Sequence, residues 1–149
     1  MILISRKMQA QGNLANLVGG IFFTGVTILL WDLLRTVNQW LSTSAAVLSL
    51  LGCLPPSWYK TAHISNFLFF GLYCLLVGYL VLRSRFFPKA VGVLMACAGV
   101  CWLITNWPWL ASATAPYTTI MGLVGEGTLM GYLLINGLDE RRWREADLA

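Results

Sequence analysis

Glu126 is the residue whose position in the sequence most needs a chemical explanation. It is an acidic side chain near the middle of an apolar stretch of helix length, and glycine stands on both sides of it. A charged side chain at the centre of a bilayer costs about 3 kcal/mol on insertion scales, so it tends to be neutral, paired or facing water. One interpretation is a hydrogen bond that ties its helix to a neighbour such as Asn66, Tyr73 or the polar face of the first helix. The alternatives are a proton relay or ion site, and a substrate-binding role.

Two further pairs of residues have spacings that support chemistry. Asp32 and Arg35 are three positions apart near the end of the first apolar segment, which places them within reach of an ion pair. Such a pair either anchors the helix end at the membrane interface or gates a path through the protein. Cys97 and Cys101, four positions apart, share a helix face and offer two soft ligands to a metal, but two thiols alone make a weak site, so packing is favoured.

The sequence shows no set of residues typical of an enzyme. His63 is the only histidine, which excludes a haem held by two histidines or a histidine-rich zinc site within one chain. The position of His63 favours an interfacial residue. Neither a Ser-His-Asp order, an HExxH motif, a glycine-rich phosphate loop nor paired intramembrane aspartates is present. We therefore expect no enzymatic activity, no cofactor and no metal.

The composition is that of a membrane protein. Of 149 residues, 58% are hydrophobic and 11% are charged, and the mean hydropathy is +0.70, whereas about a quarter of the residues of a soluble domain are charged. The net charge is +4 and the pI is near 9.1. Because the basic residues stand at the ends of apolar stretches and not on one soluble face, we expect membrane lipid and not nucleic acid as a partner.

The apolar stretches predict an all-α fold, a polytopic transmembrane bundle of about five helices that forms one domain over residues 1–149. The predicted helices cover about 13–34, 37–54, 64–82, 91–110 and 117–136. The uncharged link 111–116 is expected to be a non-cytoplasmic turn. Segment 37–54 carries several polar residues and ends at Pro55-Pro56; if it does not span, the bundle has four transmembrane helices.

Basic residues predict the orientation of the bundle. Three of them, Arg83, Arg85 and Lys89, lie in one short turn, and three more lie in the tail, 137–149. Because cytoplasmic loops carry an excess of Lys and Arg, both this turn and the C-terminal tail are expected on the cytoplasmic side. The side of the N-terminus depends on whether segment 37–54 spans.

Small residues predict where helices approach closely. The fourth predicted helix carries Gly92, Ala96 and Gly99 as a seam. The fifth carries Gly122 and a GxxxG pair, Gly127 and Gly131. In membranes such residues let helix backbones approach each other.

An ordered set of short motifs resembles a known family. These are Gly78-Tyr79-Leu80, Arg83-Ser84, Phe87-Pro88, Gly92, Gly99, Gly125-Glu126 and Leu133-Leu134-Ile135-Asn136-Gly137, with Leu34-Arg35-Thr36-Val37-Asn38 before them. Together they resemble the bacterial integral membrane family catalogued as domain of unknown function 4386, over about Gly19 to Trp143. The resemblance implies an all-helical membrane protein with no assigned activity, substrate or cofactor. It also implies a form that is short at the N-terminus, and Tyr132 stands where the family commonly has tryptophan.

Three hypotheses for function follow. The first is a structural, interaction or accessory subunit of the bacterial inner membrane, C-terminus cytoplasmic, that packs through glycine-rich helix faces as a homo-oligomer or with a partner subunit. The second is a small proton-coupled transporter or carrier that uses Glu126, with Asp32 and Arg35 at a gate. The third is a lipid- or quinone-binding protein that uses the tryptophan-rich end of segment 91–110.

Overall fold

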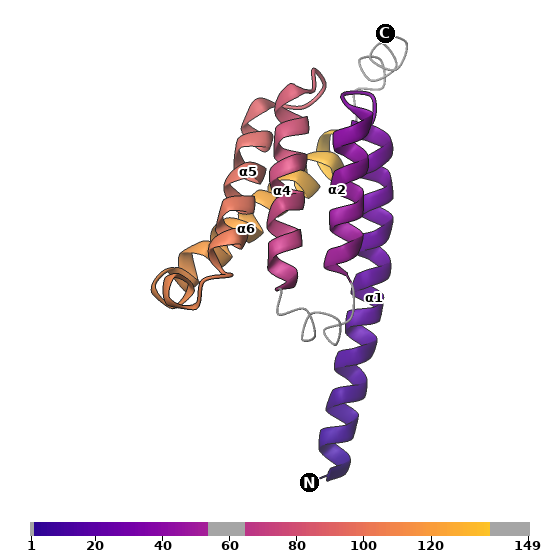
Figure 1. Ribbon diagram of the computed structural model, residues 1–149. Coiled ribbons are helices and arrows are strands. Elements are labelled where there is room, and N and C mark those ends of the chain that lie inside the picture. The colour runs from indigo at the N-terminus through magenta and orange to yellow at the C-terminus, as the bar shows by residue number, and fades with distance from the viewer. Residues whose placement is uncertain (1, 54–64, 138–149) are drawn as a thin grey trace.

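In the computed structural model, residues 2–53 and 65–137 are described, with side chains from residue 17 onward, and in these ranges the chain consists of α-helices joined by short turns, with no strand. The five helices, in chain order, are α1 (Ile2–Leu34), α2 (Gln39–Gly52), α4 (Asn66–Arg83), α5 (Lys89–Ile104) and α6 (Pro108–Asn136) (Figure 1). The predicted all-α bundle is confirmed. His63 and the tail after Gly137 lie outside the described residues.

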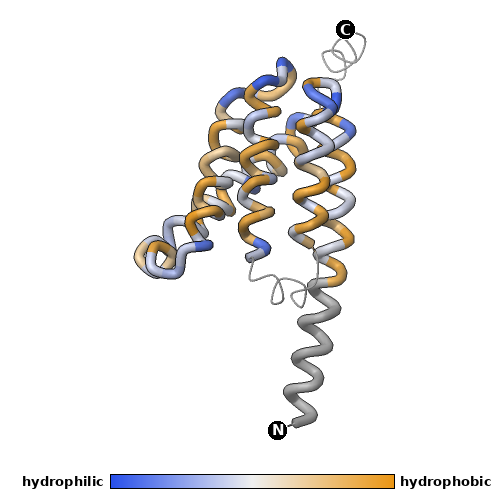
Figure 2. Tube along the Cα trace, in the orientation of Figure 1, coloured by the Kyte–Doolittle hydropathy of each residue, from blue (hydrophilic) through white to orange (hydrophobic). Residues whose placement is uncertain are grey.

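The helices run alternately up and down, so that two turns lie at the same end of the bundle. The turn between α1 and α2 and the turn between α4 and α5 both lie at the upper end in Figure 1, and α6 returns toward that end from below. The central helix is α4, which packs between α2 and α5, while α6 packs on α5. Hydrophilic residues gather at the two upper turns, and apolar residues fill the helix middles (Figure 2).

Local hydrogen bonds explain where α2 and α4 begin. Asn38 precedes α2 and accepts a hydrogen bond from the Leu41 backbone N–H at 3.0 Å. Ser65 precedes α4 and accepts one from the Phe67 N–H at 3.2 Å. Side-chain oxygens at these positions satisfy N–H groups that the first helical turn leaves without partners. Both helices therefore start at residues whose side chains cap them.

Glycines bring α4 and α5 into close contact. A Cβ atom at Gly78 would lie 2.7 Å from the Ala96 nitrogen, and one at Gly99 would lie 2.8 Å from the Gly71 carbonyl oxygen. A Cβ atom at Gly92 would lie 2.9 Å from the Leu82 nitrogen. Real Cβ atoms do not approach backbone this closely, so the predicted seam on α5 is occupied by α4 of the same chain.

Within residues 2–53 and 65–137, three helices are long and apolar enough to cross a membrane, and this length and composition indicate a membrane protein. The apolar spans are Leu17–Leu34 in α1, Asn66–Arg83 in α4 and Pro108–Asn136 in α6, whereas the apolar α5 is shorter. With 14 residues, α2 is about 21 Å long, less than the ~30 Å of hydrocarbon in a bilayer. Whether segment 37–54 spans stays a prediction.

The observed helix boundaries differ from the predicted ones on both sides of the α5–α6 turn. α5 ends at Ile104 and α6 begins at Pro108, so segment 111–116, expected to be a turn, is helical. Proline is favoured in the first turn of a helix, where its missing N–H has no partner to lose, so Pro108 starts a helix. The hydroxyls of Ser112 and Thr114 then donate to carbonyls of their own helix, at Trp109 and Leu110.

Candidate functional site at Glu126

Glu126 is hydrogen-bonded to a tryptophan on the neighbouring helix. The Trp102 Nε1–H of α5 donates to Oε1 of Glu126 on α6, with 2.6 Å between the two atoms. The Glu126 side chain is half-buried. The sequence pointed to Asn66, Tyr73 or α1 as the source of a partner, so the partner itself is a residue that sequence reasoning missed.

Gly122 makes room for the tryptophan. It lies one turn before Glu126, and a Cβ atom there would lie 2.7 Å from Cε2 of the Trp102 indole. Gly125 has a similar role against the α5 backbone, because its Cβ would lie 2.6 Å from the Leu94 carbonyl oxygen. The two glycines let α6 approach α5 closely enough for the carboxyl group and the indole to meet.

A cluster of aromatic rings fixes the orientation of Trp102. The Phe67 ring stacks on the indole, with 5.4 Å between centroids and 4° between planes, and the Phe70 ring meets it edge-on at 5.6 Å. Phe70 in turn contacts Phe23 of α1 at 5.6 Å and Tyr73 at 6.1 Å. Such pairs contribute about 0.5–1.5 kcal/mol each beyond their burial. The indole N–H is therefore held in place from α1 and α4 as well as from α5.

The chemistry of this contact is that of a fixed donor and an acceptor. The indole nitrogen of tryptophan only donates, and it does not exchange its proton with a carboxyl group under ordinary conditions. The bond therefore joins α5 to α6 and satisfies a tryptophan that needs an acceptor once it is removed from water. The one sequence signal that could have revealed Trp102 is that a buried tryptophan needs a hydrogen-bond acceptor. Glu126 is the only acidic residue in the apolar part of the sequence after Asp32.

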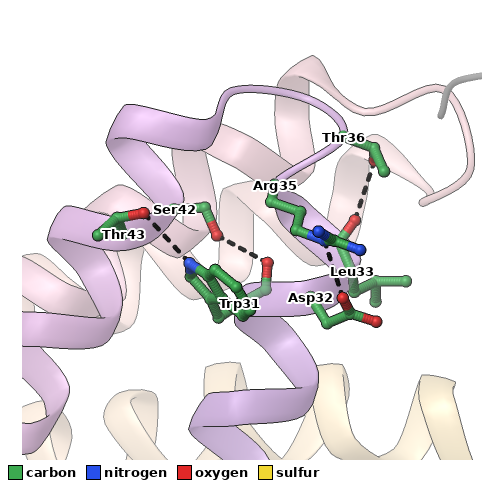
Figure 3. A network of polar contacts seen from close by, with 7 residues as sticks. All are labelled: Trp31, Asp32, Leu33, Arg35, Thr36, Ser42 and Thr43. Carbon is green, nitrogen blue, oxygen red and sulfur yellow. Dashed lines mark hydrogen bonds and ion pairs between the residues drawn. The ribbon is translucent and has the colours of Figure 1, made fainter.

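Asp32, near the end of α1, and Arg35, directly after that helix, form the expected ion pair, apart from the Trp102 contact. Arg35 Nε lies 2.8 Å from Asp32 Oδ1, and the two side chains are 43% and 50% exposed. The Arg35 guanidinium also lies over the Trp31 ring at 5.5 Å. Figure 3 shows the pair beside the bonds that join α1 to α2, where Trp31 Nε1 donates to Thr43 and the Ser42 hydroxyl donates to the Trp31 carbonyl.

A comparison with known families covers the part of the chain that holds Trp102 and Glu126. The sequence profile of the family described as domain of unknown function (DUF4386) matches residues 58–137, more than half of the chain. The chain belongs to the DUF4386 family. The match is narrower than the resemblance, because it does not include the α1–α2 turn. No curated protein and no solved structure gives a significant match.

The DUF4386 match contains α4, α5 and α6, which together build the Glu126 site. Asn66 is the first residue of α4 and is exposed, whereas Tyr73 is buried in the aromatic cluster at 4% exposure. Helix α1 adds Phe23 to that cluster from outside the match. The DUF4386 part of the chain therefore supplies the carboxyl group, its donor and the glycines between them.

Gly127 and Gly131 differ from the other glycines of the DUF4386 helices. A Cβ atom built on either of them would have no other atom within 4 Å. Gly71, Gly78, Gly92, Gly99, Gly122 and Gly125, in contrast, would each clash with a neighbouring helix. The GxxxG pair of α6 is therefore not used for packing within the described chain.

Proposed function

We propose that this DUF4386 chain is an interaction or accessory subunit of the bacterial cytoplasmic membrane, and that α6 is the helix that contacts its partner. The partner is a second copy of the chain or a helix of another membrane subunit. In this proposal the basic turn between α4 and α5 and the C-terminus are cytoplasmic, and the chain carries out no catalytic step.

The observation that carries the proposal is the open GxxxG pair of Gly127 and Gly131. Each glycine in a helix interior costs about 1 kcal/mol relative to alanine. Six glycines of α4, α5 and α6 offset that cost through close helix contacts inside the chain, and these two do not. Close approach of a partner helix would offset it, as in other membrane helix pairs.

The side chains around the pair fit a helix contact. Leu123 is 60% exposed and Val124 is 46% exposed on the turn before Gly127, and Leu134 is 85% exposed on the turn after Gly131. Apolar side chains on both sides of a glycine groove give a partner helix a surface for van der Waals packing, which drives helix association in lipid.

The Glu126 site supports a structural role better than transport. Its hydrogen bond goes to Trp102, whose nitrogen does not relay protons, and the flanking glycines serve the contact between α5 and α6. Within this proposal, Glu126 holds α6 at a fixed rotation on α5. That rotation directs Gly127 and Gly131 away from the bundle.

The mass of the particle in mild detergent tests the proposal. We expect the wild type to be larger than a monomer or to carry a partner subunit, and the double variant Gly127→Ile/Gly131→Ile to be a folded monomer. The control is Gly25→Ile on α1, where a Cβ also meets nothing within 4 Å. A strictly monomeric wild type without a partner, or a loss of assembly in Gly25→Ile alone, would overturn the role of α6.

A further inference from the structure

The turn between α4 and α5 is packed against the bundle. Ser84 ends α4, and its hydroxyl donates to the Val81 carbonyl at 2.7 Å. Phe86 and Phe87 are buried at 5% and 6% exposure, and the Phe87 ring contacts that of Tyr132 on α6 at 5.6 Å. Because the phenylalanines point inward, the basic residues of the turn remain at the surface on a fixed backbone.

Arg83 is positioned by an aromatic residue one turn before it. Its Nε donates to the Tyr79 hydroxyl at 3.1 Å, and its guanidinium lies 5.6 Å from the centre of the Tyr79 ring. These contacts use Nε and leave the terminal nitrogens without a hydrogen bond to the described residues. The planar end of a guanidinium matches two oxygens of a phosphate group.

Lys89 adds a second cation at the start of α5. It is the first residue of that helix and is exposed, and Pro88 before it provides no side-chain cap. The N–H groups of a first helical turn carry partial positive charge and favour anions. Arg83 and Lys89 therefore border the same short turn, Arg83 at the end of α4 and Lys89 at the first residue of α5.

The residues around the turn fit a ligand that has both an anionic group and an apolar part. One helical turn deeper lie exposed apolar surfaces, Tyr79 at 43% and Val93 at 50% exposure. Among residues whose side chains are described, the acids are Asp32 and Glu126, and Asp32 is already bonded to Arg35. No described acid therefore neutralises Arg83 or Lys89 through an ion pair.

We infer that the α4–α5 turn is a binding site for the phosphate of an anionic phospholipid, which Arg83 and Lys89 bind while the acyl chains lie along Tyr79 and Val93. This goes beyond the proposed helix contact, since it concerns another surface and a lipid ligand. Arg35 at the same end of the bundle is excluded from the site because Asp32 neutralises it.

Lipid retention by the full chain tests the inference. The purified protein is mixed with phosphatidylglycerol or phosphatidylcholine of identical acyl chains, and bound lipid is measured by native mass spectrometry. We expect preferential retention of phosphatidylglycerol. Removal of a cation near an anionic lipid lowers affinity about fivefold, so Arg83→Gln/Lys89→Gln should bind it about 25-fold more weakly.

Arg35→Gln is the control, because it removes one positive charge at the same end of the bundle from an arginine that is already paired with Asp32, and it should keep the preference. Equal retention of the two lipids by the wild type would overturn the site, as would an equal loss in Arg35→Gln. A second arm adds inorganic phosphate or the soluble headgroup glycerophosphoglycerol. If either displaces the lipid at equal concentration, the site binds a soluble phosphate and the inference of a lipid ligand is wrong.

Discussion

Trp102 Nε1 donates to Glu126 Oε1 across the contact of α5 and α6, at 2.6 Å. Through this bond, an acidic residue within an apolar helix links α6 to α5. The bond also depends on α4 and α1, because the indole packs against Phe67 and Phe70 of α4, and Phe70 contacts Phe23 of α1. The hydrogen bond of the carboxyl group on α6 therefore depends on the packing of α1 and α4 as well as on that of α5.

Replacing Glu126 separates the need for an acceptor from the need for a charge. Glu126→Gln keeps a side-chain oxygen that accepts from Trp102, so we expect stability close to that of the wild type. Glu126→Leu leaves the half-buried indole N–H without an acceptor and should cost about 1 to 3 kcal/mol. Unfolding in mixed detergent micelles measures both. Equal losses in the two variants would mean that the charge, and not the hydrogen bond, stabilises the contact of α5 and α6.

Gly125 should not tolerate a methyl group. A Cβ at this position would lie 2.6 Å from both the Ala98 Cβ and the Leu94 carbonyl oxygen, so Gly125→Ala has to push α6 away from α5 at a cost of about 1 to 3 kcal/mol. Gly25→Ala is the control, because its Cβ meets nothing within 4 Å and alanine favours the helix by about 1 kcal/mol. The midpoint of thermal unfolding should fall in the order Gly25→Ala, wild type, Gly125→Ala. A reversed order would contradict the close contact of α6 with α5.

Proton flux tests the transport hypothesis directly. Because tryptophan holds Glu126 through a nitrogen that does not relay protons, we expect liposomes with wild-type protein and with Glu126→Gln to conduct protons at the same rate. A pH-sensitive dye inside the liposomes, under an imposed potential, gives the rate. Flux in the wild type that disappears in Glu126→Gln would restore the carrier hypothesis and remove the purely structural role.

The ion pair of Asp32 and Arg35 should contribute little to stability. Both partners are close to half exposed, and pairs of this kind contribute below about 1 kcal/mol. We expect Asp32→Asn to shift the unfolding midpoint slightly and the shift to shrink at high salt, where exposed charges are screened. A large effect that is independent of salt would show that the pair acts in a more buried setting than α1 provides.

Hydropathy predicted much of this fold, because helix formation depends mainly on neighbours in the sequence. The apolar stretch before Arg83 and the basic residues after it place the α4–α5 turn, whereas the helix caps at Asn38 and Ser65 were not predicted. The predicted boundary between segments 91–110 and 117–136 was wrong, because proline both ends and starts helices and only the three-dimensional path shows that Pro108 starts one.

The partner of Glu126 was beyond this reasoning. Trp102 reaches it only because α5 and α6 pack at one particular rotation, which the glycines at Gly122 and Gly125 permit. The sequence indicates that glycines favour close contact, but not which helix each one meets. For the same reason, the sequence did not show whether the seam at Gly92 and Gly99 meets a helix of the same chain or of a partner, whereas the structure shows that α4 occupies it.

The unequal lengths of the helices have a consequence for the surrounding bilayer. α5 has 16 residues and is about 24 Å long, whereas α6 has 29 residues and is about 43 Å long. Where both helices cross a bilayer of uniform thickness, the bilayer does not match both lengths, so we expect lipid beside α5 to compress and α6 to tilt, each at a fraction of a kcal/mol per Å of mismatch. We therefore expect the membrane to be thinner beside α5 than beside the longer helices of the bundle.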